Sequence, residues 1–362
     1  TYFLARPVYI KSENALFYIT KDQTAYFRDV DTMKVRREKK LLDIPRSEYL
    51  TLLAPEKDKR LYFASLTRNK QKKLVTVVGA FELPSLRLLY KKEFRRRGLC
   101  RYSENRAKLL THKDSLVAVL FDGCLVAMNK RDGKTKWFKN PLKSVKRGWF
   151  SKSVTQLPSR SIRAKILDGK LFCIDVNVRY GVYLFQLPRD EKYIGACDPR
   201  TRISVYDLET GKELFNQGSK FSFANAVQAN GIKIIGYPYH RYRRRGGVFV
   251  FDYPSLKRRW MLERSYLLIA MNEERGKLLC SRDRNLLEVD IVSGKLKRLF
   301  RAEKGNRFLR AIYGKCGKEL LVCRFRKMLK LAGSPLKVAW SRDCSSLIFN
   351  NHILLDDIIV FY

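Results

Sequence analysis

Residues 203–215 read ISVYDLETGKELF, which combines a β-strand, a tight turn and the start of a second strand. Ile203 and Val205 are β-branched residues of the kind that favour pleated strands. Asp207 and Gly211 are turn residues at the point where the chain must reverse. This stretch therefore predicts a β-hairpin.

The hairpin is repeated along the chain. Close copies occupy residues 125–134 (LVAMNKRDGK), 248–257 (VFVFDYPSLK) and 287–295 (LEVDIVSGK), and weaker copies occupy residues 26–34 and 78–87. A unit of strands repeated about every 40 to 50 residues is typical of the blades of a β-propeller. We therefore predict an all-β fold, with residues 1–362 forming a single β-propeller domain with long loop insertions around residues 139–160 and 176–202.

Each blade is expected to have four antiparallel strands, and the count of turns favours seven blades, with eight as the alternative. Residues 1–6 are predicted to be an outer strand that pairs with the C-terminal blade and closes the ring. Residues 336–340, 346–349 and 357–362 are predicted to be the first three strands of that last blade, and residues 182–187 a strand inside the second insertion. In the first blade, the first three strands are predicted at residues 7–10, 15–20 and 26–30. In each of the following blades a second and a third strand are predicted, at residues 61–65 and 74–81, 116–121 and 125–128, 170–175 and 203–206, 232–237 and 248–251, 277–280 and 286–289, and 320–325 and 328–331.

Two stretches resemble known propeller repeats. Residues 206–212 (YDLETGK) resemble the repeats of quinoprotein-type propellers, and residues 338–343 (VAWSRD) resemble those of WD-type propellers. The resemblance implies the architecture of that superfamily. The Trp-Asp and Gly-His pairs of WD repeats and the adjacent cysteines of quinone enzymes are absent from the sequence. The resemblance therefore implies no cofactor.

The chain is strongly basic, with 75 Lys and Arg against 35 Asp and Glu and a formal net charge of +40. Such an excess spreads repulsion over the surface and calls for an anionic partner. Nucleic acid is the commonest partner of such a surface. Acidic proteins, polysaccharides and anionic lipid headgroups are the alternatives.

The cysteines indicate a reducing, intracellular compartment. Most of the eight lie in apolar strand-like runs, and no pair has the spacing of a zinc or redox motif. The three histidines are isolated, so a metal site is not expected. No apolar run is long enough for a membrane span, and the printed N-terminus lacks the pattern of a secretory signal.

The repeat predicts where the positive charge gathers. In a four-stranded blade, the connections between second and third strands and between successive blades leave on the same edge, so their basic runs should share one face. Trp149, Tyr239 and Tyr242 lie among these cations and could stack on unpaired bases, or could instead anchor the loops. The predicted nucleic-acid-binding residues are Arg68, Lys70, Lys72, Lys73, Arg95, Arg96, Arg97, Lys146, Arg147, Trp149, Tyr239, Arg241, Tyr242, Arg243, Arg244, Arg245, Arg282, Arg284, Arg324, Arg326 and Lys327.

The opposite face is predicted to be more thinly basic. One cation follows the turn between the third and fourth strands of each blade, and ordinary turn chemistry explains it. These cations are Lys34, Arg87, Lys134, Lys212, Lys257 and Lys295.

Catalysis is not expected, because the sequence has no phosphate-binding glycine loop, zinc-ligand motif or nucleophile elbow. The sequence favours a non-catalytic propeller that binds RNA through the nucleic acid backbone, as a structural component of a larger ribonucleoprotein particle such as a ribosome. The alternatives are a scaffold for an acidic protein partner in an intracellular complex, and an enzyme or sugar-polyanion binder with its site in the central channel.

Overall fold

The computed structural model describes most of the chain, in two compact units. The described residues are 4–42, 44, 49–95, 107–139, 160–177, 201–219, 222–237, 247–263, 265–302, 308, 310–313, 319–324, 327–343, 352–355 and 358–361. The first unit is Thr1–Ala196 with Arg202–Gln217, and the second is Cys197–Thr201 with Gly218–Tyr362. No helix in the described ranges is long and apolar enough to span a membrane.

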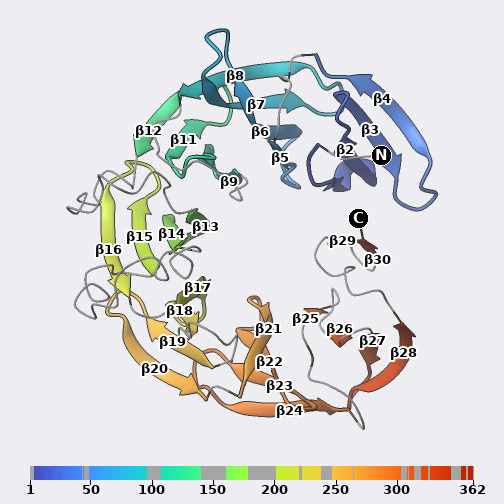
Figure 1. Ribbon diagram of the computed structural model, residues 1–362, viewed down its shortest axis with the longest axis vertical. Coiled ribbons are helices and arrows are strands. Elements are labelled where there is room, and N and C mark those ends of the chain that lie inside the picture. The colour runs from blue at the N-terminus through green and yellow to red at the C-terminus, as the bar shows by residue number, and fades with distance from the viewer. Residues whose placement is uncertain are drawn as a thin grey trace, which may run out of the picture. The chain divides into compact units, whose positions relative to one another are not determined.

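The first unit contains four antiparallel sheets of four strands each, and the strands of each sheet lie in chain order. In Figure 1 these sheets follow one another along an arc, with the fourth strand of each on its convex side. The sheets are β1 (Val8–Ile10), β2 (Ala15–Ile19), β3 (Thr24–Asp29) and β4 (Val35–Lys40), with a short 3-10 helix (Lys11–Glu13) between the first two strands; β5 (Tyr49–Leu53), β6 (Arg60–Arg68), β7 (Leu74–Glu82) and β8 (Leu88–Arg95); β9 (Lys108–His112), β10 (Ser115–Val119), β11 (Leu125–Asn129) and β12 (Thr135–Lys139); and β13 (Arg160–Leu167), β14 (Lys170–Asn177), β15 (Thr201–Asp207) and β16 (Glu213–Ser219), whose last two residues fall in the second unit.

The second unit adds three sheets of the same design and one two-stranded hairpin. The sheets are β17 (Ser222–Gln228), β18 (Ile232–Tyr237), β19 (Val248–Asp252) and β20 (Lys257–Leu262); β21 (Leu267–Asn272), β22 (Lys277–Arg282), β23 (Asn285–Asp290) and β24 (Leu296–Arg301); and β25 (Arg310–Tyr313), β26 (Leu320–Arg324), β27 (Lys327–Ala332) and β28 (Lys337–Asp343). The hairpin is β29 (His352–Leu355) and β30 (Ile358–Phe361).

Burial changes across each sheet in a way that the sequence explains. The second strands are apolar and buried on both faces, as in β2 (ALFYI) and β10 (SLVAV), where every residue is buried. The fourth strands are polar and exposed, as in β4 (VRREKK), where every residue is exposed. Burial of apolar side chains on both faces of the inner strands is the main stabilising contribution. Charged outer strands also discourage pairing with other chains at the sheet edge.

The core lies between neighbouring sheets. Phe17 and Phe27 of the first sheet pack in one cluster with Phe63 and Phe81 of the second. Similar clusters join the second sheet to the third and the third to the fourth. Within the second unit, clusters join the β17–β20 sheet to the β21–β24 sheet, and the latter to the β25–β28 sheet. Sequential face-to-face packing of this kind is how propeller blades bury their apolar surface.

Tryptophan residues on two outer strands pack against the turn of the next sheet. Trp137 of β12 packs over Gly211 in the β15–β16 turn and donates its Nε1–H to the carbonyl of Leu208 at 2.8 Å. Trp260 of β20 packs over Gly294 in the same way. Both glycines have positive φ, at 67° and 73°, and a side chain at either position would meet the indole ring. The glycine of the repeated turn therefore serves both the backbone conformation and the contact between sheets.

The structure confirms the predicted β-propeller fold with seven four-stranded blades, and all the predicted pairs of second and third strands in those blades. One assignment was wrong: residues 336–340 belong to the fourth strand of a blade, β28, because Lys330 of β27 pairs with Trp340. Residues 358–361 pair only with β29 among the described strands. The predicted strands at 182–187 and 346–349 lie outside the described residues, as do residues 1–3, and Leu4 bonds to the carbonyl of Ile19.

Candidate nucleic-acid interface

Many of the predicted binding residues lie outside the described part of the chain. The described side chains are Arg68, Lys70, Lys72, Lys73, Arg95, Arg282, Arg284 and Lys327. The side chains that lie outside it are those of Arg96, Arg97, Lys146, Arg147, Trp149, Tyr239, Arg241, Tyr242, Arg243, Arg244, Arg245, Arg324 and Arg326. The candidate interface described below therefore consists of residues whose side chains the structure describes.

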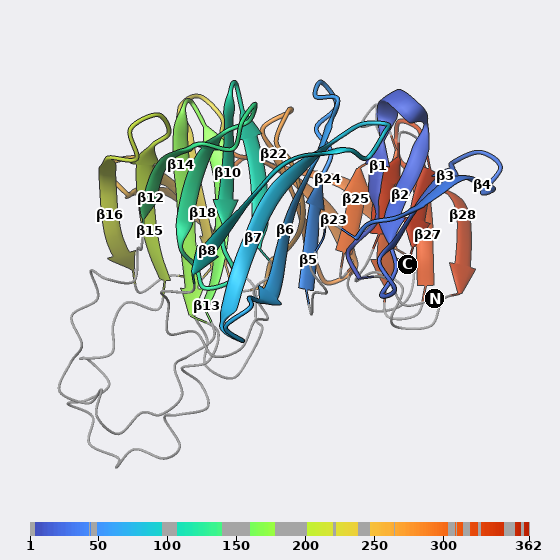
Figure 2. The ribbon, with the colours of Figure 1, turned by 90° about the horizontal axis from the view of Figure 1, so that it is seen from above.

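The turns that connect the strands of each sheet lie at the two ends of the strands, and we name these two sides of the sheet by the turns they contain. At one edge the second strand turns into the third and the fourth strand ends; we call it the 2–3 edge. At the other, the first strand turns into the second and the third into the fourth; we call it the 3–4 edge. In the β5–β8 sheet, Arg68 pairs with Leu74 and Val75 pairs with Arg95, so the end of β8 lies beside the β6–β7 turn. Figure 2 shows β6, β7 and β8 side by side.

The β6–β7 turn is held by its own hydrogen bonds. The side-chain oxygen of Asn69 accepts the backbone N–H groups of Gln71 and Lys73, both at 3.0 Å. The backbone N–H of Asn69 donates to the carbonyl of Lys73 at 2.9 Å, and that of Lys72 donates to the carbonyl of Asn69 at 2.8 Å. An asparagine that bonds to backbone groups two and four residues ahead stabilises a tight turn. The lysines of the turn are therefore presented on a defined backbone.

Five cations gather at this 2–3 edge, and we call them the basic tip. All five are exposed, and none forms a salt bridge with another described residue. Their positive charge is therefore not neutralised by any described carboxylate. The basic tip consists of Arg68, Lys70, Lys72, Lys73 and Arg95.

The carboxylates that neutralise this sheet lie at its other end. Glu82 pairs with Arg60 in the strand register and binds Arg87. Asp58, just before β6, binds Lys130 with both carboxylate oxygens, at 3.0 and 3.2 Å. Arg60 and Arg68 are the two ends of β6, so these acids lie roughly 26 Å along the strand from the tip, at about 3.3 Å per residue. Glu93, which is exposed in β8, is the acid in the sheet nearest to the tip in sequence.

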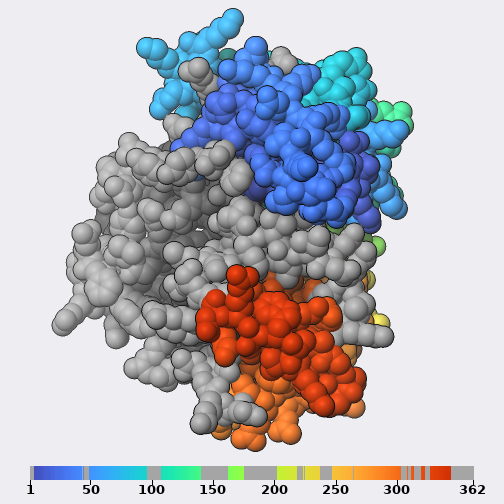
Figure 3. Space-filling view, turned by 90° about the vertical axis from the view of Figure 1, so that its right-hand side faces the viewer, coloured from blue at the N-terminus to red at the C-terminus, as the bar shows by residue number. Residues whose placement is uncertain are grey.

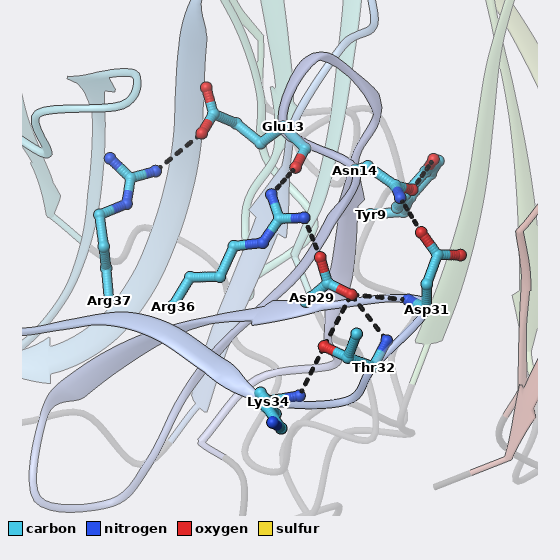
Figure 4. A network of polar contacts seen from close by, with 9 residues as sticks. All are labelled: Tyr9, Glu13, Asn14, Asp29, Asp31, Thr32, Lys34, Arg36 and Arg37. Atoms are coloured by element: carbon cyan, nitrogen blue, oxygen red, sulfur yellow. Dashed lines mark hydrogen bonds and ion pairs between the residues drawn. The ribbon is translucent and has the colours of Figure 1, made fainter.

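The first sheet shows the chemistry of the 3–4 edge in detail. Figure 4 shows Arg36 between Asp29 and the backbone carbonyl of Glu13, while Arg37 binds the Glu13 carboxylate at 2.9 Å. The Asp29 carboxylate also accepts hydrogen bonds from the backbone and hydroxyl of Thr32. Arg36 and Arg37 are therefore both engaged by local acids or carbonyls.

The same turn recurs at the 3–4 edges of other blades. Asp207 accepts from the backbone and hydroxyl of Thr210, which lowers its pKa. Asp290 accepts from the backbone and hydroxyl of Ser293 and binds Lys277, which together lower its pKa to about 2. These carboxylates stay ionised and hold the 3–4 edge closer to neutral.

The basic residues that follow these turns accept a hydrogen bond through their backbone carbonyls. The carbonyls of Lys34, Lys134, Lys212 and Lys295 accept the N–H of the first turn residue, at 2.8 to 3.0 Å. Arg87 closes the equivalent turn in β7–β8. These bonds define the turn at this position through backbone groups alone.

The second unit has a related but weaker 2–3 edge. Arg282 and Arg284 flank the β22–β23 turn, and Arg301 at the end of β24 pairs with Asn285 beside them. Arg282 is exposed, and its guanidinium donates one hydrogen bond to the hydroxyl of Tyr266 at 2.9 Å and lies 5.0 Å from the ring centroid. This hydrogen bond raises the pKa of Arg282 and ties the chain before β21 to the turn. Lys327 is exposed, and its partner in the strand register is Asp343.

Three further cations at the 2–3 edges were missed by the sequence reasoning. Lys40, Lys139 and Arg301 end the fourth strands β4, β12 and β24, and their partners Thr24, Leu125 and Asn285 begin the third strands. The signal was present, because in an antiparallel blade the last residue of the fourth strand always shares the 2–3 edge.

The structure describes some of the cysteines and possible metal ligands. Cys280 is a free, buried cysteine, and burial raises its pKa to about 12. Across the described ranges, no group of three or more His, Cys, Asp or Glu side chains could hold a metal ion.

Comparison with known proteins bears on the fold. No protein-family model matches the chain. No curated protein sequence matches it either. Among solved structures, it is similar to BamB from Moraxella catarrhalis, with a TM-score of 0.52 and 12% identity over 88% of this chain and 82% of that one. It is also similar to the computationally designed Ika8 protein, with a TM-score of 0.56 and 11% identity over 99% of this chain and 92% of that one. BamB is a β-propeller, so the likeness supports that fold and, at this identity, nothing beyond it.

Proposed function

We propose that this propeller binds RNA through the phosphate backbone, as a non-catalytic component of a ribonucleoprotein particle such as a ribosome. The observation that carries the proposal is the separation of charge within the β5–β8 sheet. The basic tip is exposed and forms no salt bridge with a described acid, whereas Asp58 and Glu82 are engaged in ion pairs at the 3–4 edge of the sheet. Clustered Lys and Arg side chains attract a phosphate backbone by releasing its counterions.

We also propose a superfamily for this propeller, and a reducing, intracellular compartment in which it works. The recurring Asp-to-Lys turn with its glycine under an aromatic ring supports membership in the superfamily of quinoprotein-type and WD-type propellers. The buried thiol of Cys280 supports a reducing, intracellular compartment.

The test compares two triple variants with equal loss of charge. One carries Lys70→Gln, Lys72→Gln and Lys73→Gln at the tip, and its control carries Lys34→Gln, Lys134→Gln and Lys212→Gln at the 3–4 edges. Binding of a fluorescent RNA is measured over a range of salt concentrations.

The tip variant is expected to reduce the slope of log K against log salt by about 2 to 3, at roughly 0.7 to 0.9 per phosphate contact. The control should keep the slope of the unmodified protein. Equal effects of the two variants would mean that only net charge matters, and no binding to RNA would refute the proposal.

An acidic protein partner is the rival outcome. Purification of the native complex with and without ribonuclease separates the two, because contacts to a protein survive digestion of RNA. Loss of the associated components after digestion is expected. Their retention would favour the scaffold function.

A further inference from the structure

The β6–β7 hairpin is built from the longest strands that the structure describes. Its two strands have nine residues each, more than any other described strand. Figure 3 shows the light-blue part of the chain, which includes this hairpin, projecting from the surface at the upper left. A projecting hairpin can reach a partner before the rest of the sheet does.

The cations of the basic tip lie on both faces of the sheet. Paired residues of neighbouring strands point to the same face. Arg68 pairs with Leu74, which packs against the cluster shared with the third sheet. Arg95 pairs with Val75, which belongs to the cluster shared with the first sheet. Arg68 and Arg95 therefore point to opposite faces of the same blade.

The five residues of the basic tip include no aromatic ring on which a base could stack. Residues 68–73 read RNKQKK and contain no aromatic residue. The aromatic side chain beside Arg95 is Phe94, which is 9% exposed and stacks on Phe138 at 6.3 Å. Recognition of unpaired RNA relies on bases stacked on exposed aromatic or guanidinium planes. The only flat groups that this tip offers are its two guanidinium groups, one on each face.

We infer that the basic tip binds duplex RNA. Its Arg68 face would contact the phosphate backbone of one RNA strand, and its Arg95 face would contact the phosphate backbone of the other RNA strand. The inference rests on the proposed function and narrows it to a class of RNA. A duplex presents two phosphate backbones on the two sides of a groove, so a hairpin with cations on both faces can contact both. A single strand has one backbone and leaves one face without a phosphate partner. Glu93 pairs with Val77, so it shares the Arg95 face.

The experiment compares two RNAs of equal length, a perfect duplex of about 16 base pairs and an unstructured polyuridine strand. The variants are Arg68→Ala, Arg95→Ala and the double variant. Arg131→Ala is the matched control, because Arg131 is exposed in the β11–β12 turn at a 3–4 edge. Fluorescence anisotropy gives the affinity of each pair, and circular dichroism checks folding.

Each tip variant is expected to weaken duplex binding about fivefold at 0.15 M salt, which is one phosphate contact at a slope of roughly 0.9. The double variant should show the product of the two effects on the duplex. On the single strand it should lose no more than one of them. Arg68→Lys should restore most of the duplex affinity, because a lysine keeps the charge.

Equal losses on both RNAs, or a larger loss on the single strand, would overturn the inference and leave the proposed function intact. An unchanged duplex affinity in both single variants would also overturn it. Binding to neither RNA by the unmodified protein would instead refute the proposed function itself.

Discussion

The contact between Trp137 and Gly211 makes a sharp prediction about what joins neighbouring blades. Gly211 has a φ of 67°, and a Cβ added there would lie 2.7 Å from ring atoms of Trp137. Gly169, in another turn of the same sheet, has a φ of 65° and no atom within 4 Å of an added Cβ. Gly211→Ala and Gly169→Ala therefore share the backbone strain of the left-handed conformation, about 1 kcal/mol. Only Gly211→Ala displaces the indole ring.

Displacement of Trp137 adds two effects. Overpacking in a filled core costs about 1 to 3 kcal/mol. The hydrogen bond from Nε1 to Leu208, at 2.8 Å, is strained or lost and accounts for about 1 kcal/mol more. We expect Gly211→Ala to lower the free energy of unfolding by about 3 to 5 kcal/mol and Gly169→Ala by about 1 kcal/mol. Urea unfolding, followed by tryptophan fluorescence, measures both. Equal destabilisation by the two substitutions would refute the idea that this ring holds the two sheets together.

Three further predictions follow from the turns and the core. The pKa of Asp290 is about 2 in the folded protein, below its value near 3.8 in the unfolded chain, so the ionised carboxylate stabilises the fold at a pH above about 4. This stabilisation is lost as the pH falls from about 4 to 2. The free energy of unfolding of Asp290→Asn should therefore change less over this range than that of the unmodified protein, and an identical pH profile would contradict the role of the turn. Cys280, with its pKa raised to about 12 by burial, should resist alkylation at pH 8 until the protein unfolds, as peptide mass spectrometry can show, and rapid labelling in the folded protein would contradict its burial. Asn69→Ala should speed hydrogen exchange at the amides of Gln71 and Lys73 and leave the rest of the sheet unchanged, whereas unchanged exchange at these two amides would show that the Asn69 side chain does not hold the turn.

Much of the fold was predictable because local sequence and burial agree. The second and third strands are largely apolar, and most third strands end at Asp or Asn, so residues 125–134 and 248–257 identify the turn between the third and fourth strands directly. The error at residues 336–340 has a physical cause. The turn before β28 begins at Ala332, where other blades have an acidic residue or asparagine, so the turn was not recognised and Trp340 was read as part of a first strand.

The candidate site was less predictable, because contacts far apart in sequence decide which cations are available. The loop position of Arg282 was predictable, but its bond to Tyr266 depends on how two connections meet. Lys130 and Asp58 are 72 residues apart, and only the packing of the second sheet against the third brings them together. The edge on which a cation lies can be read from strand order, whereas its neutralisation requires the folded structure.

We propose that RNA contacts the 2–3 edges and leaves the 3–4 edges free. Differential acetylation of lysines, with and without bound RNA, tests this proposal on the unmodified protein by mass spectrometry. RNA is expected to protect Lys70, Lys72 and Lys73, while Lys34, Lys134, Lys212 and Lys295 should react as before. Equal protection of both groups, or protection of the second group alone, would contradict it.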